Sequence, residues 1–330
     1  MKKRLMDSFY AVVGATLVVL SASALLVPTW AQNYPIKPIR VVVGGVAGSP
    51  SDVRSRQVAL KLNEAFGQPV VVDNRPGANG AIAAKLFAKS APDGYTLFGC
   101  SPNNLLNDLF APDVSSRMIH EIAPITRLTS GPLILAVHPS VRASSLKEFI
   151  ELAKLKPGGF TYGSGSQGSI NQLFGELIQS KAGIKMNAVS YKSGAAEIPD
   201  VLGGHINATV NFYVIVGPHI TSGKLRGLAV ADAKRLAVAP DLSTTAEAGL
   251  PGVEASGWTA ICAPAGVPPR VISLLHRELV KSLNDRVIRD QIISTGGNPG
   301  GERPDEFAAF IRAELAKWGK VIKDAGISML

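Results

Sequence analysis

The sequence predicts an α/β protein with a parallel sheet and helical crossovers. Strand-like runs rich in Val, Ile and aromatic residues occur at 39–43, 69–73 and 95–98. A helical pattern of apolar residues runs to about Phe66 after the first run, and another at 82–87 follows the second. Strand-helix-strand-helix-strand at this spacing is typical of parallel strands joined by helical crossovers.

Length and composition indicate a globular chain of two domains. It has 330 residues, of which 46% are hydrophobic and 18% charged. The formal net charge is +9, which suits capture of acidic molecules, although a solvated basic surface explains it equally. Because the basic residues are scattered and aromatics make up 6%, nucleic acid is not an expected partner.

The N-terminus has the pattern of a secretory signal peptide. Lys2-Lys3-Arg4 precede an uncharged apolar run over 9–27, and Ala31 is a small residue at the expected cleavage site. We therefore expect residues 1–31 to be removed, which lowers the formal net charge from +9 to +7. The alternative is an uncleaved membrane anchor, for which the apolar run is marginally long enough.

The stretch at 160–178 combines a strand, a glycine- and serine-rich loop and a helix. The strand-like run Phe160–Tyr162 leads into the loop 163–168, and apolar residues then recur at helical spacing. Ser166 or Ser169 can cap this helix. A helix start with open backbone donors and a positive dipole end binds anions, so we expect this loop to hold a carboxylate.

The same loop spells G-x-G-x-x-G, which leaves two alternatives. Gly163, Gly165 and Gly168 fit the dinucleotide fingerprint, but that fingerprint needs an acidic residue at the end of the next strand. The next strand-like run, 187–191, continues into Lys192-Ser193 without one. A small anion is therefore favoured over a dinucleotide, and a plain strand-to-helix turn remains the other alternative.

A second loop of the same kind follows the first strand. Residues 39–43 run into the glycine- and serine-rich loop 44–52, and a helix begins there. Ser49, Ser51 or Asp52 can cap that helix. Two such loops in separate parts of the chain are able to converge on one ligand.

Signatures of catalysis and of metal binding are missing from the sequence. The chain has five histidines, none at metal spacing with Cys or acids, and it has neither a G-x-S-x-G elbow nor a Walker A loop. We expect no catalytic residues, no metal and no cofactor. Cys100 and Cys262 are able to pair in an oxidising compartment, and the sequence leaves their state open.

Several blocks carry a resemblance to a known family. They are VVVDNRPGANG at 70–80, APDGYTLF at 91–98, HITSGKLRGLAV at 219–230, APAGVP at 263–268, the opening YPIKPIRVVV and the closing DEFAAFIRAELAKWGKVIKDAGI. In this order they resemble the Bug family of extracytoplasmic solute-binding proteins, the TctC-like component of tripartite tricarboxylate transporters. The likeness covers essentially the whole mature chain.

The resemblance implies a two-lobe periplasmic binding protein fold, type II-like, with a ligand cleft between the lobes. Lobe one is expected at 32–132 and 229–330, and lobe two at 133–228. Runs at 132–138 and 225–230 are candidates for the crossing strands, and two C-terminal helices are expected to complete lobe one.

Ligand-binding positions are carried over from the family pattern. They are Val46, Gly48, Ser49, Ser51 and Asp52 in the first loop, Ser164, Gly168 and Ser169 in the second, and Asn211 and Phe212 after a lobe-two strand. This chain has Gly44-Gly45 where the family has a Pro-Phe pair, and Asn211-Phe212 where it often has Asp-Asn or small polar residues.

These departures favour an aromatic or bulky carboxylate. Asn211 in place of an acid removes a negative charge, Phe212 adds a flat apolar wall, and Gly45 in place of Phe opens volume. The alternative is that Phe212 packs within its lobe.

The predicted function is a periplasmic receptor, expected to be a monomer. It would capture an organic carboxylate and deliver it to the permease subunits of a tripartite tricarboxylate-type transporter. The alternative is a periplasmic carboxylate sensor that feeds a signalling partner.

Overall fold

Three parallel strands form the sheet that the sequence predicts at the start of the chain. The computed structural model describes residues 34–110 and 118–327. Strand β1 (Ile39–Val43) pairs in parallel with β2 (Val70–Asn74) and with β3 (Thr96–Cys100). Helices α2 (Pro50–Phe66) and α3 (Ala81–Ala88) provide the two crossovers, which confirms the predicted order.

The expected signal peptide, residues 1–31, lies outside the described residues. The described residues from Lys37 onward form one compact unit. Among the described residues, none of the helices combines the length and the apolar character needed to cross a lipid bilayer.

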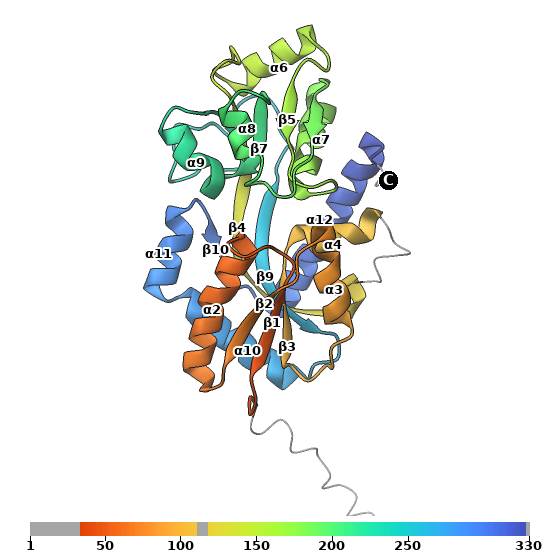
Figure 1. Cartoon of the computed structure of the whole chain (residues 1–330), viewed down its shortest axis with the longest axis vertical. Helices are drawn as coiled ribbons and strands as arrows, with labels where there is room; N and C mark the ends of the chain where they lie inside the picture. Colours follow the sequence, from red (N-terminus) through yellow and green to blue (C-terminus); the bar gives the residue numbers. More distant parts are fainter. Residues whose placement is uncertain (1–33, 111–117, 328–330) are drawn as a thin grey trace, which may run out of the picture. The chain divides into compact units, whose positions relative to one another are not determined.

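One long strand connects the two halves of the fold. Strand β4 (Ile122–Val137) pairs in its first part with β9 (Ser256–Pro264), which also pairs with β3. In its second part β4 pairs with β7 (Ala208–Phe212) and β8 (Arg226–Val230). The partner changes between Pro132 and Leu133, and Figure 1 shows β4 and β9 running between the two halves.

We call the half built on β1, β2, β3 and β9 lobe one and the half built on β5 to β8 lobe two. In lobe two, β5 (Thr161–Gly163) lies between β7 and β6 (Asn187–Val189) and is parallel to both. Strand β8 stays in this sheet, and the chain re-enters the first sheet with β9. The residue boundaries of the lobes expected from the sequence stay a prediction.

Helices cover both sheets, and the C-terminal region has one more than expected. The remaining elements are η2 (Ala78–Gly80), α4 (Pro102–Phe110), α5 (Met118–Glu121), α6 (Leu146–Leu155), α7 (Ile170–Ala182), α8 (Ile198–Leu202), α9 (Tyr213–Thr221), α10 (Pro269–Leu283), α11 (Arg286–Ser294), β10 (Asn298–Pro299) and α12 (Pro304–Ala325). The prediction of two C-terminal helices was wrong. Asn284 is the C-cap of α10, and Asp285 starts α11 as its N-cap, because its side chain accepts hydrogen bonds from the Val287 and Ile288 amides.

The last helix contributes to the cores of both lobes. Phe307 and Ile311 of α12 pack in the lobe-one cluster, where Trp258 meets Phe307 edge-on with ring centroids 5.6 Å apart. About two and three turns after Ile311, Trp318 and Ile322 pack in the cluster that contains most of the lobe-two core. The apolar residues that recur at helical spacing along α12 are therefore part of the core.

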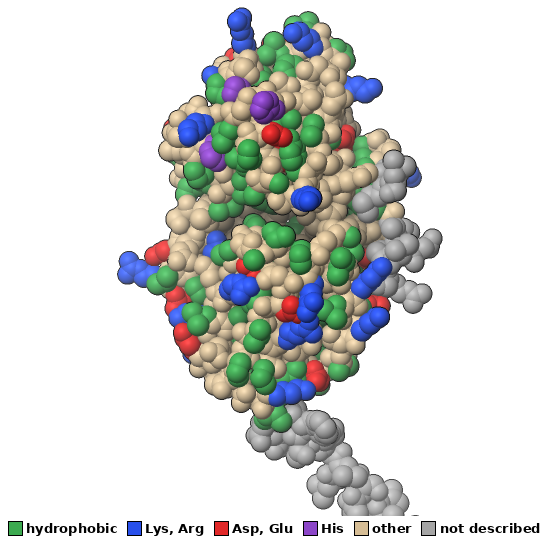
Figure 2. Space-filling model, viewed as in Figure 1, with side chains coloured by type: hydrophobic (Ala, Val, Ile, Leu, Met, Phe, Trp, Pro, Cys, Tyr) green, Lys and Arg blue, Asp and Glu red, His purple; other side chains and the backbone are tan. Residues whose placement is uncertain are grey.

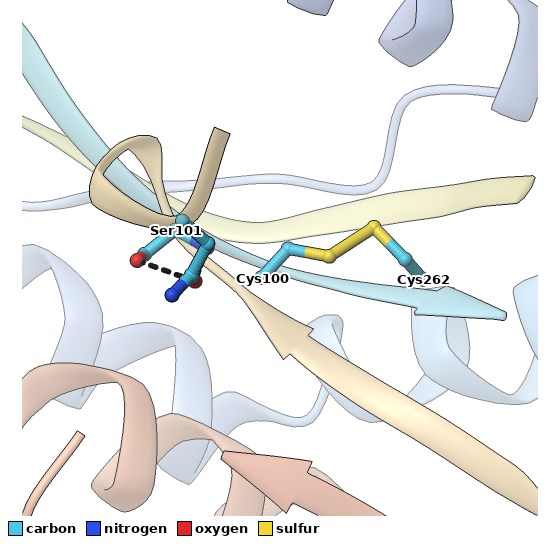
Figure 3. Close-up of a disulfide and its surroundings, with 4 residues drawn as sticks. Cys100, Ser101 and Cys262 are labelled. Atoms are coloured by element: carbon cyan, nitrogen blue, oxygen red, sulfur yellow. Dashed lines mark hydrogen bonds between the residues drawn. A yellow bond between two sulfur atoms is a disulfide. The ribbon is translucent and has the colours of Figure 1, made fainter. Parts of the chain in front are cut away.

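The two cysteines, whose state the sequence leaves open, form a disulfide. Cys100 at the end of β3 is bonded to Cys262 of β9, and both are fully buried (Figure 3). Immediately after Cys100, Ser101 donates to the side-chain oxygen of Asn104 at 2.9 Å from its amide and 2.8 Å from its hydroxyl. The disulfide thus fixes the point from which α4 leaves the sheet.

Candidate functional site

The first glycine- and serine-rich loop ends in a capped helix. Ser49 is the N-cap of α2, since its side chain accepts from the Asp52 amide. Gly48 has φ +81°, a left-handed conformation that favours glycine. A Cβ on Gly45 would overlap the hydroxyls of Ser49 and Ser51, whose oxygens are 3.2 Å apart. The volume expected beside Gly45 is therefore filled by these two hydroxyls.

Asp52 uses its carboxylate within this loop. It is buried and accepts from the Gly48 amide, the Arg56 guanidinium and the Asn74 side chain, each at 2.9 Å. Burial acts to raise the pKa of Asp52, but the hydrogen bonds from Arg56, Gly48 and Asn74 outweigh it and hold the pKa below its ordinary value. Asp52 therefore stays ionised and orders the loop backbone.

The second loop is capped in the same way. Of the two candidates, Ser169 is the N-cap of α7, and its side chain accepts from the Gln172 amide. The Ser169 hydroxyl also donates to the carbonyl of Ser164 at 2.6 Å, and the Gly168 amide donates to the Gln172 side chain at 2.7 Å. Ser164 is fully buried, and its hydroxyl donates to the Val189 carbonyl at 3.4 Å.

A buried carboxylate that sequence reasoning missed lies under the second loop. Glu197 is fully buried and accepts from the Gly165 amide at 3.1 Å, from Asn211 Nδ2 at 2.9 Å and from the Thr209 hydroxyl. Burial raises its pKa, although these hydrogen bonds act in the opposite direction. A Cβ on Gly163 would overlap the Glu197 side chain, so the loop needs glycine there.

Asn211 and Phe212 of lobe two both make contacts within the protein. Asn211 is fully buried; its Nδ2 also donates to the Gly194 carbonyl at 2.8 Å, and its Oδ1 accepts from the Phe212 amide at 2.9 Å. The half-buried Phe212 ring lies where a Cβ on Gly257 would be. This contact favours the packing alternative for Phe212, while the exposed part of the ring keeps the ligand-wall alternative open.

The two loops come together through the turn at 74–80. Gly44 lies so close to Gly80 that a Cβ on Gly44 would be 2.8 Å from the Gly80 Cα. Next to Gly80, Asn79 donates to the Gln167 carbonyl at 2.6 Å and accepts from the Ser166 hydroxyl. In the space-filling view the surface is hollowed between the two lobes (Figure 2).

Each loop offers backbone donors near this meeting point. Val46 and Ala47 are exposed in the first loop; Gln167 is exposed and Ser166 half-buried in the second. Within residues 34–110 and 118–327, the backbone amides of these four residues find no hydrogen-bond acceptor. These amides lie in the loop just before the N-cap of α2 or of α7, and open backbone N–H groups in such turns are suited to the oxygens of an anion.

The fold and the two loops together define the class of protein. Two α/β lobes joined by long strands, with donors from both lobes beside a hollow, are the arrangement of a periplasmic binding protein. The structure of "R. palustris Rpa4515 with adipate" matches with a TM-score of 0.83 and 32% identity, covering 90% of this chain and 100% of that one. The periplasmic binding protein BugD matches with a TM-score of 0.79 and 25% identity, covering 89% and 99%.

The sequence comparisons give the family. Residues 54–327 match the family described as "Tripartite tricarboxylate transporter family receptor". Protein BugT of Bordetella pertussis is 32% identical over 326 residues, 98% of this chain and 99% of that protein. The chain belongs to this receptor family, which confirms the resemblance seen in the sequence. Its relatives are solute-binding receptors.

Proposed function

We propose that this protein binds an aliphatic dicarboxylate between the loops 44–52 and 163–170 and passes it to a membrane permease. The observation that carries the proposal is the pair of donor groups, Val46 and Ala47 amides on one lobe and Ser166 and Gln167 amides on the other. If one carboxylate of the ligand accepts from each pair of amides, the ligand connects the two lobes. The adipate bound by the 32% identical Rpa4515 supports this ligand class.

The charges around the loops are compatible with an anionic ligand. The Asp52 carboxylate is paired with Arg56 and accepts three hydrogen bonds, so its charge is compensated within lobe one. The Glu197 carboxyl is turned to the Gly165 amide and to two side chains behind the loop. Neither group leaves an uncompensated acid facing the donors.

An aromatic or bulky carboxylate is the second candidate. It is favoured by the exposed part of the Phe212 ring and was the preference drawn from the sequence. The contact of that ring with Gly257 argues for the aliphatic acid first.

A thermal-shift panel tests the proposal and separates these candidates. It contains adipate and shorter dicarboxylates, citrate, acidic amino acids, benzoate and benzene dicarboxylates. A ligand at a hundredfold excess over its Kd stabilises the folded state by about 2.7 kcal/mol, which is readily measured. Shifts by aliphatic dicarboxylates alone support the proposal, while shifts by aromatic acids alone, with loss of the shift in Phe212→Ser, support the second candidate. If no carboxylate shifts the melt, the proposal is wrong.

Charge variants test the place of binding. Ala47→Asp adds a negative charge at an exposed position of the first loop, and Ala47→Asn is its uncharged control. Gln167→Glu does the same in the second loop with no change of shape. We expect each acidic variant to weaken dicarboxylate binding at least about tenfold by charge repulsion, and Ala47→Asn to bind normally. Equal affinity in all variants would contradict the proposed site.

Delivery to a permease and a periplasmic location complete the proposal. Family membership and the signal pattern at 1–31 support them. Deletion of the gene should abolish uptake of the ligand. Normal uptake with loss of a transcriptional response to the ligand would favour the sensor alternative.

A further inference from the structure

A residue in the turn after β2 is held in an uncommon conformation by its own lobe. Asn79 has φ 51° and ψ 29°, in the left-handed region that Asn tolerates better than most residues. Its carbonyl accepts from Asn104 Nδ2 at 3.1 Å and from Asn107 Nδ2 at 3.3 Å, and both of these α4 side chains are buried. Lobe one therefore fixes the backbone from which the Asn79 side chain projects.

The Asn79 side chain uses both ends of its amide on lobe two. Its Nδ2 donates to the Gln167 carbonyl at 2.6 Å, and its Oδ1 accepts from the Ser166 hydroxyl. These are the two residues whose open amides are part of the proposed site. By holding the Gln167 carbonyl and the Ser166 side chain, Asn79 sets the direction of the loop backbone between them.

A second asparagine of lobe one contacts the same region of lobe two. Asn103 lies in the first turn of α4, and its Oδ1 accepts from the Ile170 amide, the first residue of α7, at 3.0 Å. This amide is one of those left without an intrahelical partner at a helix start. Among the described residues, Asn103 thus contacts lobe two through the acceptor end of its side chain and not through its donor end.

We propose that Asn79 and Asn103 form an asparagine latch, a pair of positioning residues that holds the lobes closed. This inference rests on the proposed function only for the identity of the ligand. The latch stabilises the closed arrangement through contacts between the lobes themselves. Because a receptor binds its ligand from both lobes in that arrangement, a larger closed population raises the apparent affinity for any ligand of the site.

Asn79 uses the donor and the acceptor of its side-chain amide, whereas Asn103 uses the acceptor. The substitution of Asn by Asp is therefore expected to have opposite effects at the two positions. Asn79→Asp removes the donor and places a carboxylate oxygen against the Gln167 carbonyl, so it should open the lobes. Asn103→Asp keeps the acceptor and adds a negative charge at the N-terminus of α7, which favours the contact. Asn79→Gly removes both hydrogen bonds and retains the left-handed backbone without strain.

The distance between the lobes is the direct test, and it needs no ligand. Spin labels at the exposed positions Leu60 of α2 and Leu155 of α6 report it by pulsed electron resonance. Asn187→Ala is the control, since this exposed amide bonds the Gly158 carbonyl inside lobe two at 2.7 Å. We expect longer distances in Asn79→Gly and Asn79→Asp, and wild-type distances in Asn103→Asp and in the control. An unchanged distribution in both Asn79 variants would overturn the latch.

Affinity gives the second readout. Loss of two ordinary hydrogen bonds in Asn79→Gly should raise the Kd for adipate about tenfold, while Asn187→Ala leaves it unchanged. If adipate does not bind the wild type but the distances shift as expected, the proposed ligand is wrong and the latch stands. If adipate binds with equal Kd in wild type and Asn79→Gly, the latch is wrong and the proposed function stands.

Discussion

The two ligand-loop candidates have the same local design but different internal anchors. Each follows a strand, contains glycine at positive φ and ends in a serine N-cap, Ser49 or Ser169. In each, a carboxylate accepts from a glycine amide of the loop. In the first loop it is Asp52, four residues from Gly48 and paired with Arg56. In the second it is Glu197, 32 residues from Gly165 and fully buried.

The carboxylate that holds the first loop belongs to the loop itself, whereas the one that holds the second loop is brought there by the tertiary fold. Asp52 is neutralised by Arg56, whose side chain is 52% exposed, so its surroundings keep access to water. Glu197 is surrounded by neutral donors in the core of lobe two, so its hydrogen bonds have no substitute in solvent. The second loop is therefore stabilised by one residue that is distant in the sequence. In the first loop, water can replace part of the hydrogen bonding of the anchoring carboxylate.

The largest expected effect is on the free energy of unfolding when each anchor is removed. Glu197→Ala leaves the Gly165 amide and the Thr209 hydroxyl without an acceptor in the core and removes one of the two acceptors of Asn211 Nδ2, and should cost about 3 kcal/mol. Asp52→Ala should cost only about 1 kcal/mol, because Gly48 and Arg56 can bond water. Urea unfolding measures both. Equal losses would contradict the distinction between the two anchors.

The next effect concerns the caps. Ser169→Ala removes the cap of α7 and the hydrogen bond to Ser164, and should cost about 2 kcal/mol. Ser49→Ala should cost about 1 kcal/mol. The control is Ser145→Ala, which removes the equivalent cap of α6 and its bond from the Glu148 amide. Isothermal titration should detect weaker ligand binding in the two loop variants and normal binding in the control. Normal binding in all three variants would mean that the caps of α2 and α7 do not affect the binding site.

The smallest expected effect is a pH dependence. Because the pKa of Glu197 is raised in the folded protein, that state binds the proton more tightly than the unfolded chain. The contribution of Glu197 to stability should therefore fall as pH rises from the ordinary Glu value, about 4.3, through the raised value. The difference in unfolding free energy between wild type and Glu197→Gln, followed over this range, isolates it. A wild-type unfolding free energy that rises with pH relative to that of Glu197→Gln would contradict the raised pKa.

The sequence predicted the parts of the fold that depend on local pattern. The strand-helix alternation before Cys100 and the two capped loops follow from the spacing of apolar residues and from capping chemistry. The break between α10 and α11 was missed, because the apolar periodicity continues past it and only the Asp285 cap marks it.

The contacts that bring distant residues together were not predictable in this way. Nothing in the sequence around Glu197 indicates that it lies under a loop more than thirty residues away, and Asn79 stands out only as part of the block at 70–80 that resembles the family. The disulfide between Cys100 and Cys262 likewise depends on the pairing of β3 with β9. The ten expected site residues stay a prediction, and the buried contacts of Asp52, Ser164 and Asn211 indicate that these three shape the loops.

The most direct test of the central claim is nuclear magnetic resonance of the ¹⁵N-labelled protein titrated with adipate. The claim is that both loops hold one dicarboxylate through open backbone amides. We predict that the amide signals of Val46, Ala47, Ser166 and Gln167 shift together, with one Kd, while the Gly165 amide bonded to Glu197 shifts little. Shifts confined to one loop, or shifts elsewhere with all four amides unchanged, would contradict the account.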